Sequence, residues 1–413
     1  MKFKKNSKII GAFLGTIVEY YDYSLYAFSA SIIASKFFAE NDNLDNLIKV
    51  FGVYAIAYMS KPIGSLIFGH LGDNYGRKIT LSTTIVGIAI PTTIIGILPC
   101  YSSIGIYSTI ILIICRFVQG LFIAGEYDGA AIYVIEHLGE KYRSTASAIT
   151  RSTGVIGLLL GISMANFCNS HIFPEWGWRI PFLLSLPLAL ISLYYRHNLD
   201  ETPEFIEAKS QNPQKIGTKD LIKKQWKVIL VIILMAGGFG VTYQIAIIFM
   251  KQYLTIILPQ TAFIMSTFSV LLVLCFGISM VIAGFIADRT SQIFIIQFSL
   301  AGVILASILF SIAIKFQMIN LALGSCIMLA IFVAPFNGIA HGIIVQALHV
   351  NERYRVISLG HTLGSMLMSG TANYICLISM KTFDCNLFPI IYLTSFSILS
   401  YFSVRFFKNS YGK

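Results

Sequence analysis

The stretch GTIVEYYDYSLY, residues 15–26, places two carboxylates, Glu19 and Asp22, inside a long apolar run. A charged side chain at the centre of a bilayer costs at least about 2.5–3.5 kcal/mol, so such residues are usually functional. At helical spacing, four polar residues of this stretch fall on one face: Glu19, Asp22, Tyr23 and Tyr26. A carboxylate held in such a place can bind and release a proton when its surroundings change. The stretch therefore predicts a proton-exchanging group.

The elements that would position these residues are long apolar blocks. Of the 413 residues 56% are hydrophobic and only 12% are charged, against about 25% charged in soluble domains. The blocks reach 18 or more residues, enough to cross about 30 Å of hydrocarbon as helices. β-Barrel strands, which alternate in polarity, are excluded. We predict an all-α membrane protein with twelve transmembrane helices, near 9–37, 48–69, 79–99, 104–136, 144–168, 179–196, 226–253, 262–287, 293–315, 318–347, 356–380 and 386–407.

Basic residues alternate between the connections. The N-terminus and every second loop are rich in Lys and Arg, and the intervening loops are almost free of them. This pattern predicts that both termini are cytoplasmic. The net charge of +11 then faces anionic lipid headgroups, and no nucleic acid is needed to explain it. One long polar stretch divides the chain into three predicted parts: a six-helix bundle at 1–197, a cytoplasmic linker at 198–225 and a second bundle at 226–413.

The two halves share a motif. GHLGDNYGRK begins at Gly69 and GFIADR begins at Gly284, so that Gly69 and Gly284, like Asp73 and Asp288, are 215 positions apart. Equal spacing is expected of duplicated halves. The first copy resembles the hallmark G-x-L-x-D-x-x-G-R-K of the major facilitator superfamily. Six further stretches are similar to its metabolite:proton symporter family: VEYYDYSLY, KPIGSLIFGHLGDNYGRK, RFVQGLFIAGEYDGA, WGWRIPFLL, LDETPEF and YRVISLG.

The resemblance implies a rocker-switch carrier whose central cavity lies between the halves and is lined by helices 1 and 4 of each. Arg116, in the fourth span, lies at a depth similar to that of Glu19. On this basis Glu19 or Asp22 exchanges protons while Arg116 pairs alternately with the carboxylate and with substrate. The alternative is a permanent structural ion pair.

Eight polar residues are candidates for substrate binding: Tyr23, Tyr26, Lys61, Arg151, Tyr243, Gln244, Asn337 and His341. The family usually has arginine at Lys61, and a lysine lacks the bidentate fork; a snorkelling or structural role is the alternative there, and Arg151 is similarly ambiguous. Pro335 and Gly338 are expected to interrupt span 10. His341 could titrate, although a hydrogen-bonded structural histidine is favoured, and Tyr243 could line a cation site or simply pack.

Ten further residues are assigned to gating, most of them by the resemblance, as a cytoplasmic network that latches the halves together: Gly69, Asp73, Gly76, Arg77, Lys78, Glu126, Glu136, Arg143, Asp288 and Arg289. Glu126 shares the segment GEYDGA with Asp128. A cytoplasmic-vestibule acid without substrate contact is the favoured interpretation for this segment, with gating or coupling as the alternative.

Enzyme classes find no support in the motifs. The sequence has no G-x-x-x-x-G-K-[ST] for ATP, no HExxH and no G-x-S-x-G, and its seven cysteines show no metal-ligand spacing. We expect no enzyme, no metal and no cofactor other than the proton gradient. The predicted function is proton symport of a small zwitterion of the proline or betaine type into the cell.

Two alternatives remain at this point: a dicarboxylate:proton symporter, favoured by the extra cations Lys61 and Arg151, and a transporter-like nutrient sensor. The expected partners are substrate, protons and the lipid bilayer. We expect a monomer in the inner membrane.

Overall fold

The computed structural model describes residues 2–39, 43–138, 142–168, 172–197, 200–202, 206–207, 217–346 and 348–411, and within these ranges all regular structure is helical. The first half contains α1 (Lys2–Phe28), α2 (Ala30–Phe37), α3 (Asn43–Asn74), α4 (Arg77–Ile97), α5 (Tyr101–Ile104), α6 (Ile106–Leu138), α7 (Arg143–Cys168) and α8 (Arg179–His197). The second half contains α10 (Thr218–Tyr243), η2 (Gln244–Phe249), α11 (Met250–Ile257), η3 (Pro259–Thr261), α12 (Met265–Ala287), α13 (Gln292–Lys315), α14 (Ile319–Gln346), α15 (Val350–Gly364), η4 (Ser365–Ser369), α16 (Gly370–Phe383) and α17 (Phe388–Tyr411).

Ten helices among the described residues are long and apolar enough to cross a membrane. Two of them are composite: Thr218–Ile257 joins α10, η2 and α11, and Glu352–Phe383 covers most of α15 with η4 and α16. The expectation of an all-helical, multi-pass membrane protein is confirmed. The helices α1 and α8 are not among the ten, yet α1 packs along α7 and α8 packs along α4 in the same bundle. A count of twelve spans therefore stays a prediction.

The polar linker differs from the prediction at its C-terminal end. Helix α10 begins at Thr218, inside the segment 198–225 that was assigned to the linker. Its first turn carries Asp220, which favours a helix N-terminus. Most of the rest of that linker lies outside the described residues.

Irregular turns occur where the sequence did not predict them. Span 10 was expected to break at Pro335, but α14 runs unbroken through it from Ile319 to Gln346, because neighbouring helices and side chains can satisfy backbone groups freed by a proline. The irregular segments are instead two π-helical turns, η2 and η4. Such turns occur frequently at functional sites.

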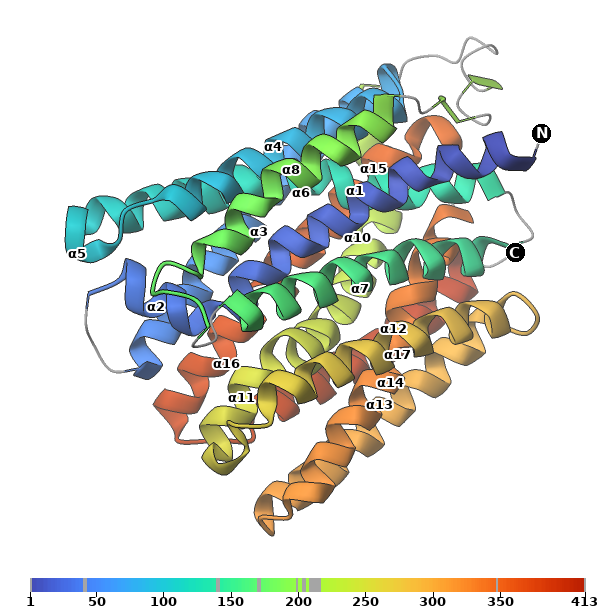
Figure 1. Ribbon diagram of the computed structural model, residues 1–413. Coiled ribbons are helices and arrows are strands. Elements are labelled where there is room, and N and C mark those ends of the chain that lie inside the picture. Colours follow the sequence, from blue (N-terminus) through green and yellow to red (C-terminus); the bar gives the residue numbers. More distant parts are fainter. Residues whose placement is uncertain are drawn as a thin grey trace.

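The two halves pack side by side mainly through four helix pairs. In the first half α7 packs on α12 and α14, and α3 packs on α15 and α16. Figure 1 shows the blue-to-green helices of the first half lying alongside the yellow-to-red helices of the second, with both chain ends at the same end of the bundle. We call this the termini end and the opposite one the far end.

Candidate functional site

A cavity of about 70 Å³ lies between the halves. About 10–15 Å³ is enough for one water molecule, so this space suits several waters or a small solute. Seven of the predicted site residues line it: Glu19, Tyr23, Lys61, Arg151, Tyr243, Gln244 and Asn337. The structure places two other candidates, Tyr26 and His341, outside the lining.

The cavity carries charges of both signs. The carboxylate of Glu19 and the cations of Lys61 and Arg151 all line it, and each of these residues is at most 7% exposed. The Lys61 ammonium lies 3.9 Å from the ring centroid of Tyr58. Atom Oε2 of Glu19 is buried and has no hydrogen-bond partner among the residues that the structure describes. An unpaired polar atom in such a place is costly unless a ligand or a proton occupies it in another state.

Gln244, which lines this cavity, joins the two halves. It lies in the π-turn η2, and its Nε2 donates to the Tyr23 hydroxyl at 3.0 Å and to the Tyr54 hydroxyl at 3.2 Å. A third phenol, Tyr58, is also hydrogen-bonded to the same amide. One glutamine of the second half is thus held by three tyrosines of the first.

Asp22 lies away from the cavity, inside the first half. Its Oδ2 accepts hydrogen bonds from Ser185 of α8 at 2.8 Å and from Thr92 of α4 at 3.2 Å, and it is 2% exposed. The two carboxylates of the opening stretch therefore have different surroundings. Glu19 faces the solute space, and Asp22 faces two hydroxyls.

Arg116 forms no ion pair with Glu19 or Asp22 within the described part of the chain, so the alternating pairing stays a prediction, and a permanent ion pair is absent from this state. Its Nη1 donates to Gln119 at 2.8 Å, and its guanidinium lies 4.3 Å from the Tyr26 ring centroid. Gln119 donates to Thr92 at 2.6 Å, and Thr92 contacts Asp22. The acid and the base are connected through two polar side chains that occupy the space between them.

At the termini end, five charged residues join the halves; we call them the latch: Asp73, Arg77, Glu136, Arg353 and Arg355. Arg355 donates to Asp73 at 2.8 Å. Glu136 lies 3.4 Å from Arg77 and 3.1 Å from Arg353. Since Arg353 and Arg355 belong to α15 and the other three belong to the first half, the latch ties the halves together.

The duplicated motif places its two aspartates in related positions. Asp73 accepts from the backbone nitrogen of Arg355 at 3.3 Å, in the first two turns of α15. Asp288 accepts from the backbone nitrogens of Ser144 at 3.0 Å and Thr145 at 2.9 Å, at the start of α7. A carboxylate at a helix N-terminus is stabilised by the helix dipole. Each aspartate therefore binds a helix of the opposite half.

The glycines and the lysine of the first motif shape the turn before α4. Gly76 has φ +110°, which favours glycine, and a Cβ there would collide with the Glu201 carboxylate. That carboxylate accepts from the backbone nitrogens of Arg77 at 3.0 Å and Lys78 at 3.4 Å. Gly69 lies against Arg355, where a Cβ would come within 3.3 Å.

Two gating assignments are wrong in this structure. Glu126 is fully buried within the first half, where its Oε2 accepts from Arg196 of α8 at 2.7 Å and from Thr84 at 2.7 Å. It therefore neither spans the halves nor lies in a vestibule. Arg289 is exposed and stacks on Phe285 at 3.6 Å, outside the latch. Arg143 begins α7 at the same end.

Asp128 is not a vestibule acid either, because it is buried between the halves. His341 Nε2 lies 2.9 Å from Asp128 Oδ1, and His361 Nδ1 lies 3.1 Å from Oδ2. Arg151 Nη2 lies 2.7 Å from the same Nε2 of His341. We call these four residues the histidine cluster. The donor atoms of Asp128 and the two histidines are close enough for a metal, but the guanidinium against His341 opposes a dication, so we do not assign them as ligands.

Several residues of the site were missed in the sequence. Arg353 and Arg355 were counted only as loop charges that orient the chain, and Arg196 was placed at the end of the sixth span without a role. Thr92 and Ser185 carry no charge, so nothing in the sequence separated them from other polar residues in apolar spans. Two family-like stretches were available signals: YRVISLG contains Arg355, and RFVQGLFIAGEYDGA contains Gln119.

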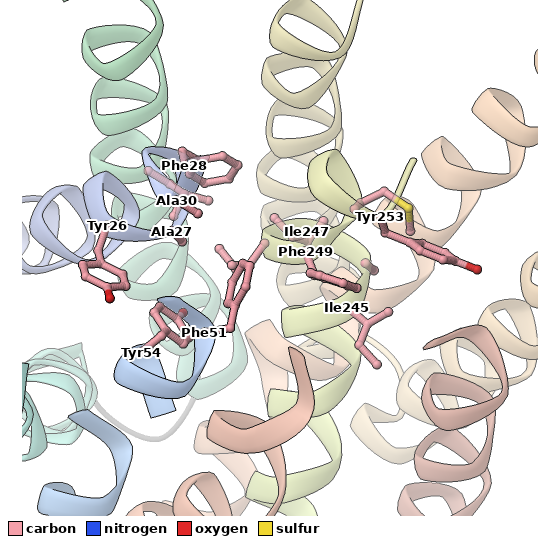
Figure 2. Close-up of a cluster of buried hydrophobic side chains, with 14 of the residues drawn as sticks. Tyr26, Ala27, Phe28, Ala30, Phe51, Tyr54, Ile245, Ile247, Phe249 and Tyr253 are labelled. Carbon is pink, nitrogen blue, oxygen red and sulfur yellow. The ribbon is translucent and has the colours of Figure 1, made fainter. Parts of the chain in front are cut away.

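The far end is joined by aromatic packing. Figure 2 shows Phe51 and Phe249 facing each other between the halves, and their ring centroids are 5.6 Å apart. Nearby, Gln252 Nε2 donates to the Ala27 carbonyl at 3.0 Å. A space of about 380 Å³, lined from both halves, lies at this end. Lys251 of α11 also donates to Asn166 of α7 at 3.2 Å, and Lys381 of α16 forms a partly exposed ion pair with Asp45 of α3. The far end thus closes by ring contact, two hydrogen bonds and one solvent-exposed ion pair.

Comparison with known proteins gives relatives over nearly the whole chain. The chain is 29% identical to the "Proline/betaine transporter" of Salmonella typhimurium, across 96% of this chain and 82% of that protein. It is 30% identical to the protein of the same name from Escherichia coli K12, across 89% and 76%. It is 28% identical to the "Glycine betaine/proline/ectoine/pipecolic acid transporter OusA" of Dickeya dadantii, across 98% and 83%.

Solved structures show the same fold. The proton:xylose symporter XylE, bound to 6-bromo-6-deoxy-D-glucose, superposes with a TM-score of 0.81 at 13% identity, over 100% of this chain and 96% of that one. The sequence profile of the Major Facilitator Superfamily matches residues 12–372. The chain belongs to the Major Facilitator Superfamily and is a multi-pass membrane transporter, not an enzyme.

Proposed function

We propose that the protein is a proton-coupled symporter that imports a small zwitterion of the proline or betaine type by alternating access. The observation that carries the proposal is the cavity between the halves, which combines one carboxylate and two cations with aromatic walls. The names of the relatives support the same substrate class, and the motifs of the metabolite:proton symporter family agree with it. Metal or organic cofactors have no part in the proposal, and the proton gradient supplies the driving force.

A zwitterion matches the two sides of the cavity. Lys61 and Arg151 suit a carboxylate, because charge-assisted hydrogen bonds are the strong ones. Tyr23, Tyr58 and Tyr243 offer ring faces to a substituted ammonium group. Lys61 already lies over Tyr58, so an entering ammonium group would compete with Lys61 for that ring.

Glu19 is the stronger candidate for the coupling acid. It lines the cavity, and within the described ranges one of its oxygens has no hydrogen-bond partner. Asp22 already receives two hydroxyl bonds, and through Thr92 and Gln119 it is connected to Arg116. In this proposal Glu19 takes up a proton, and the Asp22–Arg116 connection changes as the first half repacks.

The membrane placement follows from the loop charges. We propose twelve spanning helices, with α1 and α8 added to the ten apolar ones, and both termini in the cytoplasm of a bacterial cell with the protein in the inner membrane. A monomer contains the whole cavity. On this orientation the latch closes the cytoplasmic side, so the structure represents a cytoplasm-closed state.

One observation favours a second candidate substrate. Two cations, Lys61 and Arg151, line the same cavity, and a dicarboxylate such as 2-oxoglutarate could bind both. The test is uptake into proteoliposomes with an imposed proton gradient, in which proline and betaine compete with 2-oxoglutarate and citrate. Inhibition by proline or betaine alone supports the proposal, and inhibition by the dicarboxylates alone overturns the substrate class. Tight binding without uptake of any compound would indicate a sensor.

The coupling acid is tested in the same vesicles. Glu19→Gln should abolish accumulation driven by the proton gradient and leave counterflow exchange intact. Asp22→Asn should reduce accumulation less, and Arg116→Ala should also weaken binding, because it removes the cation that balances a buried carboxylate. If both carboxylate variants still concentrate substrate against its gradient, the proton travels elsewhere.

A further inference from the structure

A single nitrogen in the histidine cluster lies within hydrogen-bond distance of two partners. Nε2 of His341 lies 2.7 Å from Arg151 Nη2 and 2.9 Å from Asp128 Oδ1. The guanidinium nitrogen only donates and an ionised carboxylate only accepts. An imidazole nitrogen accepts when it is bare and donates when it carries a proton. It can therefore satisfy Arg151 or Asp128, but not both at once.

The two partners differ in what else they face. Arg151 also lines the central cavity, whereas Asp128 is fully buried and is held by His361 as well. When Nε2 is bare, it accepts from Arg151 and holds this guanidinium at the edge of the cavity. When Nε2 is protonated, it donates to Asp128, and its N–H then opposes the N–H of Arg151. The guanidinium is then released toward the solute space.

We propose that His341 is a proton-binding site that controls whether Arg151 is available to the substrate carboxylate. The inference rests on the proposed function, because it requires a substrate that carries a carboxylate. A proton binds Nε2, the Arg151–His341 hydrogen bond breaks, and the Asp128–His341 bond forms. Arg151 then donates to the substrate. Proton binding and substrate binding therefore strengthen each other, and by linkage the factor is the same in both directions.

The surroundings of the site can sustain this exchange. Charged or titratable groups act on it from every side: Glu126 and Asp128 on α6, Arg151 on α7, Glu19 on α1, Lys61 on α3, and Tyr354 and His361 on α15. The helix α10 contributes only Phe239, whose ring lies 5.9 Å from that of His341. Neighbouring charges of both signs make the binding and release of a proton easier than they would be in an apolar pocket.

The site also belongs to both halves. Asp128 and Arg151 come from the first half, and His341 and His361 come from the second. When the halves part at the termini end, His341 loses both of its partners together. The proton then has no carboxylate to stabilise it, and it is released on the side that has opened.

The test is substrate affinity as a function of pH, measured by calorimetry on the full-length protein with L-proline as the probe. In wild type the affinity should rise by about tenfold as the pH falls through the titration of His341, a typical size for linked binding. Calorimetry in buffers of different ionisation enthalpy should show a proton taken up with proline. His341→Gln keeps a hydrogen-bonding side chain but cannot be protonated, so the pH dependence and the proton uptake should both decrease to the part that Glu19 contributes, while binding persists. His137→Gln on α6 is the matched control and should keep both.

The outcomes separate the inference from the proposed function. If His341→Gln binds proline with the same pH dependence and proton uptake as wild type, the inference is wrong and the symport proposal stands. If wild type does not bind proline, the substrate proposal fails, and ¹⁵N-histidine spectra then decide on the site. The His341 ring should gain a proton as the pH falls, and Asp128→Asn should shift that change to lower pH, because it removes the carboxylate that stabilises the charged ring. A ring that stays neutral down to the lowest pH at which the protein remains folded, or a change that Asp128→Asn leaves at the same pH, overturns the inference.

Discussion

The two ends of the bundle are closed by different chemistry. The latch at the termini end is built from buried charges: Glu136 lies between Arg77 and Arg353, and Asp73 bonds Arg355. The far end is joined by the ring contact of Phe51 with Phe249, by two hydrogen bonds and by one ion pair, Lys381 with Asp45, whose side chains are 48% and 40% exposed. An exposed pair of this kind contributes only about 0–1 kcal/mol. Removing one partner of a buried ion pair costs about 3–5 kcal/mol, whereas an aromatic pair contributes about 0.5–1.5 kcal/mol beyond its buried area.

This difference predicts which end of the bundle opens first. Glu136 and Asp73 reach Arg353 and Arg355 only when the halves meet. Separating the halves at the termini end therefore breaks buried ion pairs, which is costly. Ring contacts can separate and re-form with little change in solvation of polar groups. On the proposed orientation the far end faces the outside. We therefore expect the protein at rest to open and close readily toward the outside and to open toward the cytoplasm only after substrate and a proton have bound.

The largest expected effect comes from the centre of the latch. Glu136→Gln removes the carboxylate from Arg77 and Arg353 together and leaves two buried guanidinium groups facing each other. A loss of about 3–5 kcal/mol is expected for the closed termini end. Spin labels on α3 and α15 should show a larger separation in distance measurements. Glu175→Gln, at an exposed acid outside the latch, is the control. An unchanged distance distribution would show that the latch does not hold the end closed.

The duplicated aspartates offer a finer comparison within the termini end. Asp73 accepts hydrogen bonds from both the side chain and the backbone nitrogen of Arg355. Asp288 accepts its hydrogen bonds from two backbone nitrogens. Asp73→Asn should therefore slow the conformational cycle more than Asp288→Asn, because a charged partner is lost as well as a helix-dipole contact of about 0.3–1 kcal/mol. Both variants should keep substrate affinity, since neither residue lines the cavity.

Exchange rates and equilibrium affinity in the two variants check this expectation. A collapse of affinity with normal exchange rates would contradict the gating role of Asp73. Equal slowing in both variants would show that the helix-dipole contact alone matters.

The sequence predicted the fold better than it predicted the site. Apolar block length and the equal spacing of the two motifs indicated the helical halves, because these properties depend only on the membrane and on duplication. In this state uncharged Thr92 and Gln119 lie between Arg116 and Asp22, and nothing in the sequence indicated this connection. Glu126 was assigned to gating from the family pattern, and its partner Arg196 was not predicted because it is seventy positions away in the chain. Side-chain partners of this kind depend on how helices turn against one another, which residue types do not specify.

The smallest expected effect lies at the far end, where Phe51→Ala removes the ring contact with Phe249. The lost aromatic contribution of about 0.5–1.5 kcal/mol corresponds to a change of roughly two- to tenfold in the population of the far-end-closed state. The variant should open more often at this end and label faster at a cysteine placed on α11, while the termini end stays closed. Phe263→Ala, at a ring that is 93% exposed and outside the interface, is the control. The labelling rate reports how far Phe51→Ala lowers the population of the closed far end, and the distance measurement reports the same for Glu136→Gln at the termini end. Equal changes in the two populations would remove the contrast between the ends, because a ring contact would then hold the halves as firmly as the buried charges do.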